Sequence, residues 1–360
     1  MPASRLSRPR GSRRKAHANQ SPASFVAPQL ATLVSKPPLG DNWLHEIKFD
    51  GYRLLAVIDR AAQSAAHLFT RAGNDWTDRF SPLRRALAEL RLDSAVIDGE
   101  AVSVGPQGSS SFHALQDALA RGKLEHLKYY AFDLLHLNGE DLRSKTLSER
   151  KALLQAVMRY APPILEYSQD FSEPGAQVLT HACTLGLEGI VSKRSDAPYV
   201  SGRSNAWLKS KCIKEQEFVI GGYTEQPKHP GVLGALLIGY YDQKILHFAG
   251  KVGTGFSADE GDALLKKLRK LGIKTASFDT VPTDARRRAR FVDPVLVAHI
   301  KFGEWTPDGR LRHPSFQGLR EDKPAREVVR EKERSLDTVA KPKSGKRRNK
   351  PAGRSHDADR

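Results

Sequence analysis

A lysine set among apolar residues is the first group in the chain with a chemical role to suggest. Lys48 lies within residues 46–53, where Ile47 and Phe49 could remove water from its amine. A lysine amine is a nucleophile only when it is unprotonated, and an ordinary pKa of about 10.4 prevents this at neutral pH. Burial and neighbouring cations lower that pKa and make a lysine reactive. Taken alone, the stretch is better explained as a strand end with a solvated lysine, because such short matches are weak.

Two further lysines stand close together near the middle of the chain. Lys209 and Lys211 are two residues apart in a predicted strand, so their side chains should leave the same face. Two ammonium groups on one face repel each other unless an anion lies between them, which favours a phosphate as ligand. Their field is also expected to lower the pKa of a nearby Lys48.

Carboxylates and an aromatic residue occur at the ends of other apolar stretches. Glu100 follows one predicted strand, Glu188 precedes another, and Phe132 lies in a third. Mg²⁺ prefers one or two carboxylates together with substrate phosphates and water. A nucleophile, a metal, cations on the phosphate oxygens and an aromatic for a base make up a phosphoryl-transfer centre. Each residue also has a plain structural explanation, such as a core aromatic for Phe132, so their joint presence carries the hypothesis.

The elements that must position these residues fall into two segments, which differ in their pattern of predicted strands and helices. Residues 25–212 mix strands with helices, which we expect over 80–90, 111–121 and 146–160, and from about 172 to 186. Residues 213–331 contain several strands joined by Gly- and Pro-rich turns, one helix opened by a capping box at 257–260, and a single strand over 295–305. That pattern suggests a small β-barrel such as an OB-fold, although another small β domain is compatible with it.

Basic charge is concentrated at the two ends of the chain. The net charge is +17, and residues 1–20 and 341–360 together supply 12 of these charges. Residues 1–24 and 332–360 are therefore predicted to be basic disordered tails that contact nucleic acid, with a solubilising role or an organelle transit peptide as alternatives.

The cysteine content bears on the cellular compartment. Only Cys183 and Cys212 occur, without a Cys-x-x-Cys pair, which argues for a reducing compartment and against a disulfide framework or structural zinc. Both are expected to be small buried apolar residues. The chain shows no secretory h-region and no apolar run long enough for a membrane span.

Seven stretches in order resemble the motifs of the covalent nucleotidyltransferase superfamily, and most closely the ATP-dependent DNA ligase module of the bacterial end-joining ligases called LigD. Residues 48–53 fit Lys-x-Asp-Gly-x-Arg, and residues 320–323 fit the closing motif Arg-x-Asp-Lys. The other five lie at 70–73, 98–100, 130–135, 188–193 and 207–211. The resemblance runs from about residue 25 to residue 331. It implies an α+β fold: a mixed, largely antiparallel adenylation domain over 25–212, followed by an OB-fold domain over 213–331.

The resemblance also implies a reaction and a role for each matched residue. Lys48 would attack ATP and carry AMP, AMP would pass to the 5′-phosphate of broken DNA, and a 3′-hydroxyl would then displace it. ATP and Mg²⁺ (or Mn²⁺) are the implied cofactors. The implied catalytic residues are Lys48, Asp50, Lys209 and Lys211. The implied ATP-binding residues are Glu46, Arg53, Arg71, Glu100, Phe132, Lys193, Lys209 and Lys211, with metal at Glu188 and Glu100 and pyrophosphate at Arg320, Asp322 and Lys323.

The implied partners are nicked or broken double-stranded DNA and a Ku-type end-binding protein, for a monomer in the bacterial cytoplasm at the nucleoid. An RNA ligase or an mRNA-capping enzyme remains an alternative, since both share the lysine motif. A DNA-binding protein with a decayed site is the non-enzymatic alternative, and the intact Lys48 and Glu188 count against it. An NAD-dependent ligase is disfavoured because its zinc cysteines are absent.

Overall fold

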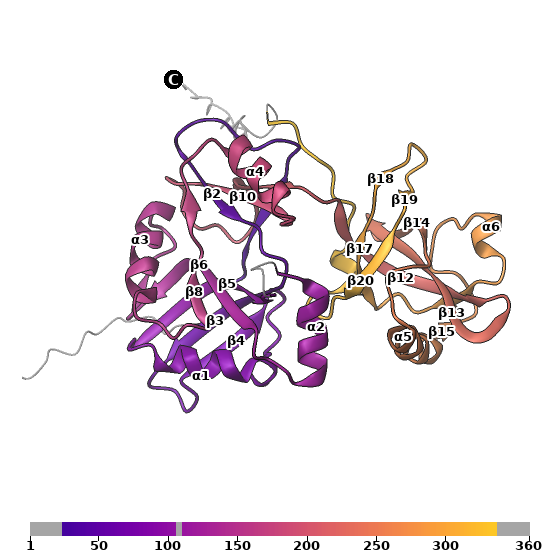
Figure 1. Cartoon of the computed structure of the whole chain (residues 1–360), viewed down its shortest axis with the longest axis horizontal. Coiled ribbons are helices and arrows are strands. Elements are labelled where there is room, and N and C mark those ends of the chain that lie inside the picture. Colours follow the sequence, from indigo (N-terminus) through magenta and orange to yellow (C-terminus); the bar gives the residue numbers. More distant parts are fainter. Residues whose placement is uncertain (1–23, 106–109, 337–360) are drawn as a thin grey trace, which may run out of the picture.

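Two sheets form the first half of the chain, at the left of Figure 1. The structure is a computed structural model that describes residues 24–105 and 110–336, so the predicted tails lie outside it except for residue 24 and residues 332–336. One sheet has the strand order β1-β11-β10-β2-β9 and pairs only β1 with β11 in parallel. Its strands are β1 Gln29–Leu33, β2 Trp43–Ile47, β9 Asp170–Phe171, β10 Gly189–Arg194 and β11 Gly202–Lys211.

The second sheet follows the order β4-β3-β5-β6-β7, with β8 parallel to β6. Strand β3 alternates between two cores: Leu54 faces a cluster that includes α1, α2 and α3, and Leu55 faces β11 and Tyr199. The two sheets thus pack through one face, and helices cover the other. The elements are β3 Tyr52–Asp59, β4 Ala66–Thr70, η1 Asp78–Phe80, α1 Ser81–Glu89, β5 Ser94–Ser103, α2 Phe112–Arg121, β6 Leu127–Leu137, β7 Glu140–Asp141, α3 Leu147–Met158, β8 Leu165–Tyr167 and α4 Gly175–Thr184.

The second half is a curved, mostly antiparallel sheet with α5 against it. Its core gathers Phe218 and Ile220 of β12 with Leu264 and Leu268 of α5. The expected strand 295–305 is wrong in one respect, because the chain bends at Gly303 and β18 pairs with β19 instead. The elements are β12 Glu215–Gln226, β13 His229–Asp242, β14 Ile245–Val252, α5 Ala258–Lys270, β15 Gly272–Ile273, α6 Thr283–Arg286, β16 Arg290–Val292, β17 Val297–Lys301, β18 Glu304–Trp305, β19 Leu311–Arg312, β20 Ser315–Leu319 and η2 Ala325–Glu327.

A final segment returns from the second half to the first. We call residues 328–334 the C-terminal strap; it is the yellow segment that leaves the right-hand half in Figure 1. Its start bridges β13 at Tyr241, and its end bridges Val34, next to β1, through Arg334. Ordered chain therefore continues into the region that was predicted to be tail.

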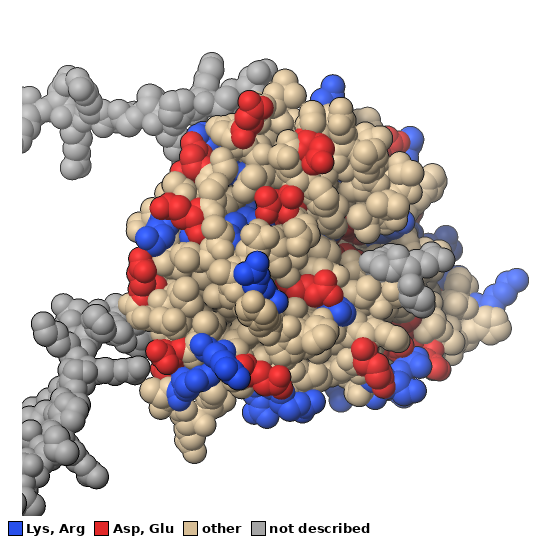
Figure 2. All heavy atoms as spheres, turned by 60° about the vertical axis from the view of Figure 1, so that its left-hand side comes forward, with Lys and Arg blue, Asp and Glu red and all other residues tan. Residues whose placement is uncertain are grey.

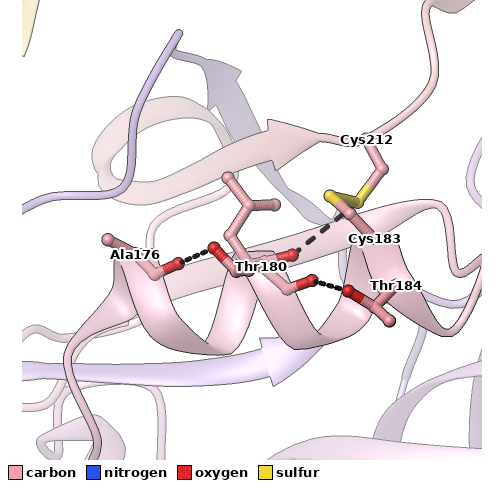
Figure 3. Close-up of a disulfide and its surroundings, with 6 residues drawn as sticks. Ala176, Thr180, Cys183, Thr184 and Cys212 are labelled. Atoms are coloured by element: carbon pink, nitrogen blue, oxygen red, sulfur yellow. Dashed lines mark hydrogen bonds between the residues drawn. A yellow bond between two sulfur atoms is a disulfide. The ribbon is translucent and has the colours of Figure 1, made fainter.

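The cysteine prediction is wrong. Cys183 at the end of α4 and Cys212 after β11 form a disulfide, which Figure 3 shows above the helix. The two residues are 29 apart in the chain, yet residues 195–201 turn the chain back so that β10 and β11 run antiparallel, with Gly189 opposite Lys211. The pairing follows from this topology, which a count of cysteines does not reveal. An argument for a reducing compartment can therefore not rest on free thiols.

Charged side chains of both signs lie side by side on the face turned forward in Figure 2. This mixture agrees with the small net charge of the chain between its ends. In the described residues no helix is long and apolar enough to cross a membrane.

Candidate active site

A cavity of about 210 Å³ opens between the two sheets of the first half and the near edge of the second half. Every site residue that the sequence predicts lines it. Lys48 and Asp50 enter from the turn after β2, Lys209 and Lys211 from β11, and the others from neighbouring strands or from the segments beside them. A Cβ at Gly51 would collide with the carbonyl of Ala101, so glycine is what allows this turn to lie so close to β5.

Lys48 points into a group of carboxylates. Its ammonium donates a hydrogen bond to Glu188 Oε2, while Lys211 Nζ lies 3.4 Å from Glu188 Oε1. Asp50, Glu188 and Glu215 each offer an oxygen, and these oxygens lie within 4.8 Å of one another. The nucleophile of the sequence hypothesis is thus held by an acid that was predicted to bind metal.

The expected low pKa of Lys48 is wrong for this arrangement. Burial acts to lower the pKa, but the charges of Glu188 and Glu215 outweigh it and hold the pKa above its ordinary value. The prediction considered only the two lysines of β11 and omitted the acids between them. Burial, together with repulsion from Lys211 and Lys48, instead lowers the pKa of Lys209 to about 8 although Glu331 opposes this.

The two lysines of β11 lie on the same side of the strand, as predicted, and each meets an acid. Lys209 Nζ donates to Glu331 Oε1 of the C-terminal strap over 2.6 Å. Lys211 Nζ lies 3.4 Å from the Glu188 carboxylate, and it donates to the backbone oxygen of Glu215 over 2.8 Å. A carboxylate of the strap therefore neutralises Lys209.

Glu46 lies on the wall of the cavity, where it is buried and fully paired. Its carboxylate accepts hydrogen bonds from Lys193 at 2.9 Å, from Lys151 at 2.8 Å and from Ser168 at 2.9 Å. Lys193 Nζ in turn lies 4.3 Å from the centre of the Phe132 ring. These contacts fix Lys193 and the aromatic side chain against each other.

Arg53 is held by its own half of the molecule. Its Nε and Nη2 donate to the two oxygens of Asp98 over 2.9 and 2.6 Å, and its Nη1 donates to the Gln29 oxygen. Tyr199 also donates to Asp98, at 2.7 Å. The planar guanidinium also lies 5.3 Å from the centre of the Phe132 ring.

The second half supplies the closing side of the cavity. Arg320 makes a two-point pair with Asp322 at 2.9 Å, and its Nη1 reaches the Gly51 oxygen of the first half at 3.2 Å. Lys323 pairs with Glu217 over 3.2 Å. The closing motif thus meets the lysine motif directly.

The donor groups suit a hard divalent cation, because all of them are oxygens. Glu188 belongs to the carboxylate group, as the sequence hypothesis requires. Glu100 lines the same cavity but is not a member of that group, and burial raises its pKa to about 8.

Sequence reasoning missed four residues of the cavity wall: Gln216, Glu217, His299 and Glu331. It also missed Glu215 of the carboxylate group and Lys151, which pairs with Glu46. The signal for two of them was present, because Glu215 and Glu217 alternate in the same way as Lys209 and Lys211. Glu331 carried no signal, since only the path of the strap brings it to the site.

A nucleotidyltransferase domain followed by an OB-fold domain is the class of protein that this fold and site define, and the predicted fold class is confirmed. The chain matches the family described as "ATP dependent DNA ligase domain" over residues 28–211 and the "ATP dependent DNA ligase C terminal region" over residues 229–323. The chain therefore belongs to the ATP-dependent DNA ligase family, whose members use ATP and a divalent metal.

Relatives and a solved structure agree with this assignment. The chain is 41% identical over 314 residues to the multifunctional non-homologous end joining protein LigD of Pseudomonas aeruginosa, covering 86% of this chain and 37% of that protein. It is 29% identical to the SPbeta prophage-derived DNA ligase-like protein LigB of Bacillus subtilis, covering 82% and 99%. A mycobacterial DNA ligase D complexed with ATP and MES has a TM-score of 0.63 at 38% identity, covering 85% of this chain and 98% of that chain. The chain thus spans about two fifths of the LigD proteins it matches.

Proposed function

We propose that the chain seals 5′-phosphate/3′-hydroxyl breaks in double-stranded DNA through a lysyl-AMP intermediate, in repair by non-homologous end joining. One observation carries the proposal: the cavity brings Lys48, the two lysines of β11 and the closing motif of the second half together. The LigD relatives support the end-joining context by their names.

In the first step, the Lys48 nitrogen forms a bond to the α-phosphorus of ATP while the bond to pyrophosphate breaks. Glu188 accepts the Lys48 hydrogen bond and helps to hold the pKa of Lys48 high, so the amine would lose its proton to solvent once a cation neutralises Glu188. Lys209 and Lys211 would neutralise the α-phosphate, and an incoming phosphate would displace Glu331 from Lys209. A divalent metal at Glu188 would supply further charge stabilisation to the phosphates.

The remaining assignments follow the shape of the cavity. Glu46, Arg53, Arg71, Glu100, Phe132 and Lys193 would hold the adenosine and its phosphate, and Arg320, Asp322 and Lys323 would orient pyrophosphate. Sealing DNA requires the second half, residues 213–331, to move away from the adenylation domain, residues 25–212, so that a duplex can reach the lysyl-AMP. We further propose a monomer in the bacterial cytoplasm at the nucleoid, assisted by a Ku-type partner.

A label-transfer assay tests the first step. Wild type, Lys48→Ala and the exposed control Lys36→Ala are mixed with α-labelled ATP, and the protein is separated in SDS without acid, because a phosphoramidate is acid-labile. Wild type and Lys36→Ala should carry label and Lys48→Ala should carry none. Label persisting in Lys48→Ala would refute the nucleophile, and transfer from GTP instead would favour a capping enzyme. Sealing of nicked DNA against nicked RNA then tests the substrate.

A further inference from the structure

Glu215 is a buried acid that has no role so far in the transfer of AMP from ATP to Lys48. Its side chain is only 8% exposed, and its carboxyl lies against that of Glu188, while no group of the described residues donates a hydrogen bond to its Oε1. A buried carboxylate oxygen without a partner costs free energy unless a ligand satisfies it. The other oxygen, Oε2, lies 3.6 Å from His299 Nε2.

The open oxygen belongs to a side chain that faces two other acids. Glu215, Asp50 and Glu188 can each place one oxygen within 4.8 Å of the others, a spacing at which three oxygens can share one cation. The neighbouring ammonium groups are directed at Glu188, through Lys48 on Oε2 and Lys211 on Oε1. Asp50 is oriented by the backbone amide of Phe112, which donates to its Oδ2 over 3.1 Å.

We propose that Glu215 is a direct ligand of the divalent cation, together with Asp50 and Glu188. This inference rests on the proposed function, because it extends the metal site of the same reaction. It assigns to the site a residue outside the seven motif stretches, and it leaves Glu100 out of the ligand set.

The position of Glu215 in the chain gives the site a second property. Asp50 and Glu188 belong to the first half, but Glu215 is the first residue of β12 and pairs with Lys301 of β17 in the second half. The link between β11 and β12 comprises residues 212–214 only. The Cys212 amide donates a hydrogen bond to the backbone oxygen of Glu188 over 2.9 Å, which ties the start of the link to the first half. A rotation of the second half about this link would carry Glu215 away from the other two acids. The complete site therefore exists only in the closed arrangement, and cation binding favours closure.

Binding of Mn²⁺ to the full chain without nucleotide or DNA tests the inference, with the free ion measured by electron paramagnetic resonance. Glu215→Gln keeps the shape of the side chain and removes its charge, and we expect Mn²⁺ affinity to fall by about tenfold or more. The matched control is Glu89→Gln, whose side chain is exposed on α1, and it should bind like wild type. Equal affinity of Glu215→Gln and wild type would overturn the proposal, as would a loss confined to Glu100→Gln.

Small-angle X-ray scattering tests the link to closure. Saturating Mn²⁺ should reduce the radius of gyration of wild type and of Glu89→Gln, and should change that of Glu215→Gln much less. The same reduction in Glu215→Gln would overturn the coupling. Thermal melting of each variant verifies that it is folded, and Glu215→Ala provides a second substitution if Glu215→Gln is not. Lysine labelling of wild type with ATP and Mg²⁺ is measured in parallel, so a failure of the proposed reaction is separated from a failure at Glu215.

Discussion

The two walls of the cavity differ in how their charges are paired. The wall from the first half satisfies its buried ions internally, as Glu46 does with Lys193 and Arg53 does with Asp98. The wall from the second half also pairs its own ions, as in Arg320 with Asp322. Fewer ion pairs cross between the walls. The most buried of them joins Glu331 of the C-terminal strap to Lys209 of β11.

This difference bears on how the molecule can open. Breaking a buried ion pair by removing one partner is costly, because the other charge is left without compensation. Since most pairs stay within one wall, separation of the walls leaves most charges compensated. The first wall is therefore a rigid, preorganised surface, whereas the second wall can move away from it and return.

The largest effect is expected where the second wall meets the lysine motif. Arg320→Ala removes a guanidinium that would orient pyrophosphate, and we expect the rate of lysine adenylylation to fall by about 10²–10³-fold. Sealing of DNA that already carries AMP should fall far less, because no pyrophosphate is involved. Rapid-quench assays of both steps measure this, with exposed Arg312→Ala as control. Equal losses in both steps would mean that Arg320 supports the fold rather than the closed arrangement.

The rigidity of the first wall can be broken at Arg150. Its guanidinium and the Asp133 carboxylate are both fully buried, with bonds of 2.7 and 2.9 Å. Arg150→Leu leaves Asp133 without its partner, so we expect the free energy of unfolding to drop by about 3–5 kcal/mol. The exposed pair of Arg143 and Asp141 offers the control, and Arg143→Leu should cost about 0–1 kcal/mol. Urea denaturation measures the free energy of unfolding of both variants. Similar losses in the two would contradict the difference expected between the buried and the exposed ion pair.

The disulfide stabilises the first wall at its link to the second. Cys183→Ala/Cys212→Ala removes a crosslink between residues 29 apart, and a loss of about 3–4 kcal/mol is expected from the greater entropy of the unfolded chain. Thermal melting with and without dithiothreitol measures it. The reductant should lower the Tm of wild type and leave that of the double variant unchanged. A Tm of wild type that does not respond would show that the thiols are free in solution.

A smaller effect is expected at Glu100, and it depends on pH. Burial raises its pKa from 4.5 to about 8, so the folded protein keeps a proton there that the unfolded chain has already lost. The unfolded state binds fewer protons between these values, and the free energy of unfolding therefore falls as pH rises. Relative to wild type, Glu100→Gln should gain roughly 1–3 kcal/mol between pH 5 and pH 8, less than the full shift because the cavity admits water. Urea denaturation of both proteins at the two pH values measures this. If the free energy of unfolding of Glu100→Gln differs from that of wild type by the same amount at pH 5 and at pH 8, the raised pKa of Glu100 is contradicted.

The sequence predicts those parts of the molecule that local patterns govern. The capping boxes at Thr146 and Ser257 open α3 and α5 as expected, and Asn138-Gly139 forms the turn between β6 and β7. The caps and this turn depend on neighbours a few positions apart. The residues of the cavity were predicted in another way, through the resemblance to the ligase motifs.

Features that depend on topology were beyond such patterns. The disulfide requires the return of β10 against β11, and the high pKa of Lys48 requires acids from three separate segments. Short strands such as β9 carry too few residues for a periodic signal, since Asp170 and Phe171 are its whole length. Glu215 lies outside the motif stretches of the sequence, and only the packing of the two halves brings it to Asp50 and Glu188.

The C-terminal strap makes the opening of the molecule observable at a single atom. The Arg334 amide donates to the Leu33 oxygen in the first half, while the Tyr241 amide in the second half donates to the Val328 oxygen at the other end of the strap. If the halves part further than the strap can span, one of these two bonds breaks, and the amide that loses its partner becomes open to deuterium from the solvent. Exchange at Arg334 compared with Tyr241 would therefore report which half keeps the strap, and how often the cavity is exposed.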